Sequence, residues 1–81
     1  MQPEQIARLI EAGIPGATAM VDGDGTHFSA VVVSSEFAGK SPVQQHRIVY
    51  RALGERMGAE IHALSMQTFT PEQWANRRPG V

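Results

Sequence analysis

Three histidines are the side chains of this sequence best suited to bind a transition metal, because neutral imidazole is a good ligand for such ions. His27 opens a predicted strand just after an Asp-Gly-Asp-Gly turn, where a polar residue is expected with or without a ligand. His62 lies inside another predicted strand, at a position that β-branched or aromatic residues usually fill. His46 lies beside the apolar stripe of a predicted helix, which favours a packing role. A metal role therefore stays open for His27 and His62.

The absence of cysteine limits any metal site that these histidines could form. With no cysteine among its 81 residues, the chain has no disulfide, no thiolate nucleophile and no sulfur ligand of its own. Its three histidines cannot complete the four ligands of a typical iron–sulfur cluster. A cluster here would need thiolates from a partner.

Asp22, Asp24 and His27 could be interpreted as an acid–base group, since carboxylates and imidazoles transfer protons in many enzymes. They lie in and beside a flexible hairpin turn, which neither excludes water nor gives a reason for shifted pKa values. We therefore expect no enzymatic activity.

The tripeptide Gly39-Lys40-Ser41 resembles the end of a phosphate-binding P-loop. Such a loop needs a glycine five positions before Gly39, and this position is Ser34, inside a predicted strand. Ser41 instead fits the N-cap of a helix, because proline follows it and Gln44 completes a capping box. The sequence favours helix capping over nucleotide binding.

Positive charge gathers around the same predicted helix, because Arg47 and Arg51 are four residues apart and Lys40 precedes them. A solvated helix face and a nucleic-acid surface both fit this pattern. Aromatic residues for base stacking are only 6% of the chain, and its net charge is -1. DNA binding through Lys40, Arg47 and Arg51 is therefore the alternative rather than the first hypothesis.

Glycine and proline divide the chain into short periodic segments that must position these residues. Apolar residues at helical spacing predict a first helix over residues 3–13. Residues 17–21 and 28–35 flank the turn and predict a β-hairpin, and residues 60–69 return to a strand pattern. A second capping box at residues 70–73 predicts a short final helix.

The middle helix is predicted to begin at Pro42 and to end at Gly58. Its expected sheet-facing stripe consists of Val43, Val49, Tyr50, Leu53 and Met57. The resulting αββαβα order predicts a two-layer α+β domain, with a three-stranded sheet and helices on one face.

Length and composition favour one soluble domain over residues 1–81. No run of about 20 apolar residues is present, and the first residues lack the basic start and apolar block of a secretory signal. We therefore expect a cytoplasmic protein that neither spans nor binds a membrane.

Five segments together resemble the BolA family, in the order that the family has them. They are GDGTHF (23–28), FAGKS (37–41), HRIVY (46–50), IHALS (61–65) and TPEQW (70–74). The chain looks most similar to the short, YrbA-like bacterial branch of that family. The resemblance implies a class II KH-like fold and a non-enzymatic role in iron–sulfur and redox homeostasis and in stress responses.

The same resemblance implies a heterodimer with a monothiol glutaredoxin that shares a [2Fe-2S] cluster. In such complexes a glutaredoxin cysteine, a glutathione thiolate and side chains of the BolA-type protein hold the cluster. His62 matches the family's histidine ligand, and a second ligand comes from the hairpin loop, here His27 or, as the alternative, Asp24. The expected docking area is the surface around residues 37–51 together with the final helix.

The sequence departs from the family pattern at two places. No cysteine is available in the hairpin loop, and Gln45 stands where many members have arginine, which reduces the basic surface of the middle helix. Some BolA-type proteins are thought to be DNA-binding transcriptional regulators, which is the alternative that the resemblance implies for this chain.

Overall fold

Capping signals set where the three α-helices of this computed structural model begin. Each helix has proline in its first turn and a glutamine whose side chain accepts the backbone N–H of the N-cap residue. The structure describes residues 1–77, and within them the helices are α1 (Pro3–Gly13), α2 (Pro42–Leu53) and α3 (Pro71–Asn76). Short 3-10 turns, Ser35–Phe37 and Gly54–Arg56, flank α2.

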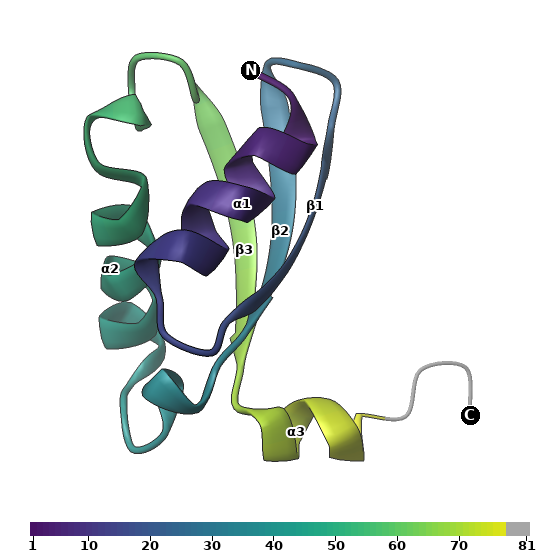
Figure 1. Ribbon diagram of the computed structural model, residues 1–81, viewed down its shortest axis with the longest axis vertical. Helices are drawn as coiled ribbons and strands as arrows, with labels where there is room; N and C mark the ends of the chain where they lie inside the picture. The colour runs from purple at the N-terminus through teal and green to yellow at the C-terminus, as the bar shows by residue number, and fades with distance from the viewer. Residues whose placement is uncertain (78–81) are drawn as a thin grey trace.

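Three strands form one mixed sheet in the order β1-β2-β3 (Figure 1). β1 (Thr18–Gly23) and β2 (His27–Val33) pair antiparallel as a hairpin, and β3 (Ala63–Phe69) pairs parallel with β2. The parallel pair needs a crossover connection, and α2 supplies it. The predicted αββαβα order is confirmed.

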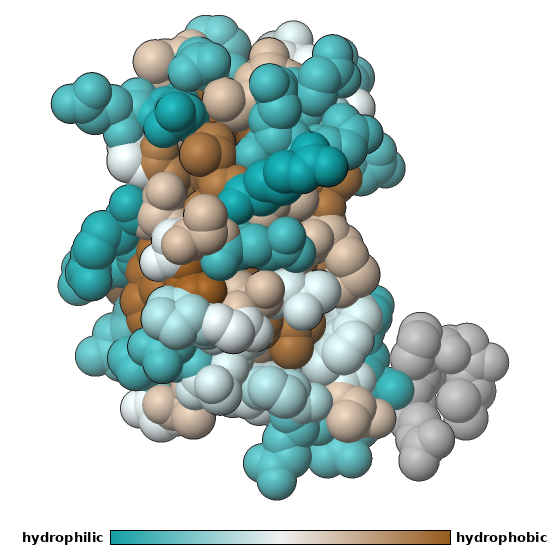
Figure 2. Space-filling view, viewed as in Figure 1, coloured by the Kyte–Doolittle hydropathy of each residue, from teal (hydrophilic) through white to brown (hydrophobic). Residues whose placement is uncertain are grey.

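Helices α1 and α2 cover one face of the sheet and bury the apolar core against it (Figure 1). Apolar residues gather where the two helices meet, and polar residues cover their outer sides (Figure 2). The largest fully buried apolar side chains are Phe37, Ile6, Ile10, Ile14, Leu53, Ile61, Val32 and Val49. In the part of the chain that the structure describes, no helix has the length and apolar character needed to cross a membrane.

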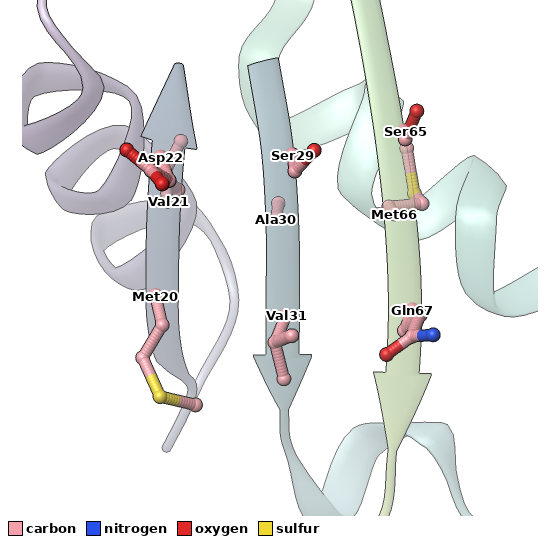
Figure 3. Close-up of a pocket in the computed structure, with 9 residues that line it drawn as sticks. All are labelled: Met20, Val21, Asp22, Ser29, Ala30, Val31, Ser65, Met66 and Gln67. Carbon is pink, nitrogen blue, oxygen red and sulfur yellow. The ribbon is translucent and has the colours of Figure 1, made fainter.

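The other face of the sheet is open to solvent. Met20, Val31 and Gln67 form one cross-strand row on it, and Asp22, Ser29 and Ser65 form the next row (Figure 3). Alternation of side chains along each strand explains why these residues face away from the helices. α3 does not cover either row, because it lies beyond the end of β3, where Trp74 packs on Phe69 with ring centroids 5.3 Å apart.

The prediction for α2 was wrong at its end and on part of its buried face. The helix ends at Leu53, because Gly54 adopts a positive φ of 59° there, so Met57 lies outside it. Val43 is 60% exposed and Tyr50 42% exposed, although both were expected in the stripe. Val49 and Leu53 are buried as predicted, and Gln45 joins them at the spacing of four that one helix face requires.

Candidate functional site

His27 and His62 lie at the starts of two adjacent parallel strands, at the same end of the sheet. His27 is the first residue of β2 and pairs with Ala63, the first residue of β3. His62 immediately precedes Ala63 in a bend, so the prediction that it lies inside the strand was wrong. Neighbouring strands are about 4.8 Å apart, and both histidines are exposed. The fold therefore brings the backbones of two imidazole donors, 35 residues apart in sequence, into adjacent positions on one accessible edge.

The hairpin loop fixes the position of His27 through Asp24. The Oδ1 atom of Asp24 accepts the backbone N–H groups of Thr26 and His27, each at 2.9 Å. The Asp24 N–H in turn donates to the His27 carbonyl at 3.2 Å, and Gly25 supplies the positive φ of 98° that the tight turn requires. The Asp-Gly-Asp-Gly sequence thus builds a turn that holds the first residue of β2 in place.

The loop before β3 is fixed by a buried neighbour of His62. Ile61 is fully buried, and its N–H donates to the Arg56 carbonyl at 2.9 Å. Its own carbonyl accepts the Gly58 N–H at 2.8 Å. Ile61 therefore anchors the bend, which leaves His62 exposed beside a well-packed residue.

Asp24 supplies negative charge beside His27. The backbone N–H of His27, followed by that of Thr26, lowers the pKa of the Asp24 carboxyl, because both hydrogen bonds favour the ionised form. Its Oδ2 atom lies 3.9 Å from Nδ1 of His27. Since Oδ1 already accepts two backbone hydrogen bonds, the geometry favours an orienting role for Asp24.

The chemistry of this donor set fits one iron of a cluster that two chains share. Among residues 1–77, no group of three or more histidine, aspartate or glutamate side chains could hold a metal ion. Two imidazoles can serve as the nitrogen ligands of one iron, as they do in Rieske centres, where the other ligands are thiolates. His27 and His62 are therefore the residues that would hold such a cluster from this chain.

His46 lies toward the opposite end of the sheet from the other two histidines. It is half-buried on α2, beside Gln45, whose Oε1 accepts the Thr68 hydroxyl at 2.6 Å near the end of β3. His62 immediately precedes the first residue of that strand, whereas Thr68 is the sixth residue of the strand. This separation agrees with the packing role that the sequence favours for His46.

Gln45 has a structural role that sequence reasoning missed. It is 8% exposed, and its Nε2 donates to the carbonyls of Phe37 and Lys40 at 3.1 and 2.9 Å. With the bond to Thr68, it joins the loop before α2 to β3. Its position fits the period of the buried face, but a glutamine is not counted in an apolar stripe, and its partners come from two segments that no local pattern brings together.

Lys40, Arg47 and Arg51 line one surface hollow together with Gln44 and Ile48. The Lys40 ammonium group donates to the Glu36 carbonyl at 2.8 Å, and Ser41 accepts the Gln44 N–H at 3.2 Å as the helix cap. These contacts confirm the capping role of Ser41. The three cations form a basic surface beside α2, separate from the two histidines at the start of β2 and β3.

Comparison with known proteins identifies the family. The profile of the family described as BolA-like protein matches residues 11–73. The chain belongs to the BolA family. Among BolA proteins of known structure, a homologue from Coxiella burnetii has 39% sequence identity and a TM-score of 0.88, covering 94% of this chain and 99% of that one.

Two curated BolA relatives are longer than this chain. BolA-like protein 1 of Homo sapiens is 51% identical over 59 residues, which are 73% of this chain and 43% of that protein. A Haemophilus influenzae protein named DNA-binding transcriptional regulator BolA is 42% identical over 52 residues, which are 64% of this chain and 50% of that protein. The chain thus spans half or less of the length of these two relatives.

Proposed function

We propose that this BolA-family chain is a non-enzymatic adaptor that binds a monothiol glutaredoxin and shares a [2Fe-2S] cluster with it. The observation that carries the proposal is the placement of His27 and His62 on adjacent strand starts, both exposed to a partner. The absence of cysteine makes the partner's thiolates necessary. Glutaredoxin cysteine and glutathione would supply them.

Each residue near the cluster position has a separate task in this proposal. His62 and His27 provide neutral imidazole nitrogens, and the Asp24 carboxylate orients the hairpin loop and His27. Histidine ligation gives a cluster less negative charge and a higher reduction potential than full cysteine ligation does. The adaptor would therefore change the redox behaviour of a cluster that the glutaredoxin also binds.

The docking area proposed for the glutaredoxin extends from the two histidines along the exposed part of residues 40–51 to α3, which lies beyond the opposite end of β3. Phe37 was expected in this surface, but it is fully buried and belongs to the core. Trp74 is half-buried against Phe69, and Arg77 stacks over its ring at 4.7 Å. α3 therefore offers an aromatic and cationic surface of the kind enriched in protein interfaces.

The test is reconstitution with a purified monothiol glutaredoxin, iron, sulfide and glutathione, followed by visible circular dichroism. We expect a spectrum that differs from that of the glutaredoxin alone and that changes with His62→Ala. Met20→Ala, on the open sheet face and outside both the histidine pair and the proposed docking area, is the control and should leave the spectrum unchanged. The proposal is wrong if adding this protein leaves the spectrum of the glutaredoxin cluster unchanged.

A second candidate function, DNA binding, rests on the hollow lined by Lys40, Arg47 and Arg51. The relative named as a DNA-binding transcriptional regulator is consistent with it. Neutralising all three cations should lower DNA affinity and reduce its dependence on salt, since fewer counterions would be released. Unchanged affinity and salt dependence would exclude this surface.

A further inference from the structure

The two outer edges of the sheet differ in how their backbone groups are satisfied. Along β1, the Ala19 N–H donates across the edge to the carboxylate of Glu11 on α1 at 3.0 Å. At the end of the same strand, the Gly23 N–H donates to Asp22 at 2.9 Å. Covering an edge in this way prevents another strand from pairing with it. β1 is therefore a protected edge.

The outer edge of β3 has no such cover. The Ser34 N–H donates to the Phe69 carbonyl at 3.0 Å, so Phe69 and alternate residues before it direct their backbone groups toward β2. The backbone groups of Leu64, Met66 and Thr68 consequently point outward. Within residues 1–77 they have no hydrogen-bond partner on that side. An added strand could satisfy all three.

The sequence of β3 also lacks the devices that usually protect an edge. Natural edge strands often carry lysine, other charges or proline. β3 reads Ala-Leu-Ser-Met-Gln-Thr-Phe, with neither a charge nor a proline in its seven residues. Nothing in the strand itself opposes pairing with a further strand.

One side of α2 borders this edge and exposes apolar surface. α1 packs against β1 and against α2, while α2 packs near β3 (Figure 1). Ala52 faces α1, since a Cβ added at Gly13 would lie 2.8 Å from the Ala52 Cβ. The opposite side of α2 carries Val43 and Tyr50, two turns apart and 60% and 42% exposed. This side of α2 therefore faces away from α1, on the helix that packs near β3.

The charges of α2 indicate what kind of segment would pair there. The helix contains no aspartate or glutamate, and its Arg47 is four residues after Val43 and three before Tyr50, so it adjoins this apolar side. Arg51 lies further round the helix, where it lines a hollow with Gly13 and Ala52 on the α1 side. An extended segment with acidic residues would therefore be attracted to it. A second copy of this chain would instead bring two such helices to the same side of a continuous sheet, arginines facing arginines.

We propose that β3 accepts an extended, acidic segment of a partner protein as a fourth strand of the sheet. Backbone hydrogen bonds to Leu64, Met66 and Thr68 would give affinity, and apolar side chains of the segment would cover Tyr50. This surface is separate from the histidines and requires no iron. Tyr50 also lies within residues 40–51, the area proposed for glutaredoxin docking, but the test uses the metal-free chain and a peptide, so either proposal can fail while the other stands.

The probe for the test is a synthetic peptide of alternating valine and threonine with glutamates at both ends. Nuclear magnetic resonance with hydrogen exchange would follow each backbone amide of the full, metal-free chain during titration. We expect the amides of Leu64, Met66 and Thr68 to gain protection, and those of Ser65 and Gln67, already bonded to β2, to gain none. The same peptide with N-methylated backbone nitrogens is the control probe and should not bind.

Substitution of two residues with equal exposure distinguishes specific binding at this surface from non-specific binding to exposed apolar side chains. Tyr50→Ala should weaken peptide binding by at least about fivefold, as truncation of an interface aromatic usually does. Met20, which is also 42% exposed, lies on the open face of β1, so Met20→Ala should leave binding unchanged. Arg47→Gln with Arg51→Gln should weaken binding at low salt and have little effect at about 1 M salt.

Several results would overturn the proposal. Protection that appears without alternation along β3, or along β1 instead, would place the contact elsewhere. Concentration-dependent dimerisation of the free chain through β3, seen by sedimentation, would make a second copy the occupant. Tighter binding of single-stranded DNA than of the peptide at the same amides would make nucleic acid the ligand.

Discussion

At the scale of single residues, Asp24 controls the hairpin loop that holds His27. Its pKa is lowered by hydrogen bonds from His27 and Thr26, so its stabilising effect is present above the unfolded-state pKa and is lost as pH falls through the lower, folded-state value. We expect the amides of Thr26 and His27 to lose exchange protection over that acidic range. A carbon-detected titration of the Asp24 carboxyl should give a midpoint below the ordinary aspartate value.

Asp24→Asn supplies the control for this prediction. The amide side chain keeps a neutral acceptor but cannot ionise, so the acid-dependent loss of protection at Thr26 and His27 should disappear. The prediction is wrong if the wild-type loop and the Asp24→Asn loop respond to acid in the same way.

The hydrogen bonds of Gln45 make a second prediction at the scale of single residues. Gln45→Ala would leave the carbonyls of Phe37 and Lys40 and the hydroxyl of Thr68 without this partner, in a buried place. We expect a loss of about 2 to 4 kcal/mol in the free energy of unfolding, measured by urea denaturation. Gln67→Ala, on the exposed face of β3, should change it by less than about 0.5 kcal/mol. Equal effects of the two substitutions would contradict the role of Gln45.

At the scale of the elements, capping sets the start of α2 and hence the position of the basic hollow. Ser41→Ala removes the acceptor of the Gln44 N–H and should lower stability by about 1 kcal/mol. Thermal unfolding followed by circular dichroism measures the effect, with Ser29→Ala on the open sheet face as the control. If the two variants unfold at the same temperature, the cap contributes nothing.

Several elements could be predicted from the sequence because their signals are local. Proline after a capping residue and glycine-rich turns placed α1, the hairpin, the start of α2 and α3 correctly. The end of α2 could not be placed so well, because Gly54 and Gly58 both adopt a positive φ and the apolar Met57 lies between them. Only the packing of Leu53 against the core shows which glycine ends the helix.

At the scale of the whole molecule, the histidine site depends on the order of the strands in the sheet, and no local sequence pattern predicts that order. His27 and His62 were candidates from residue type and family resemblance, but their adjacency follows from the parallel pairing of β2 with β3. The free edge of β3 likewise appears only once the sheet is assembled, since an edge strand and a central strand can have the same sequence pattern. The fold was therefore more predictable than the relations between its surface residues.

The central claim is that this chain contributes histidine nitrogen to a shared cluster. The most direct test is pulsed electron paramagnetic resonance of the reduced complex, formed from 15N-histidine-labelled protein and unlabelled glutaredoxin. The account predicts 15N couplings of the strength seen for directly bound imidazole, one component of which is lost in His62→Ala and another in His27→Ala. A cluster whose spectrum contains no strongly coupled 15N would contradict the account, because all its ligands would then come from the glutaredoxin and glutathione.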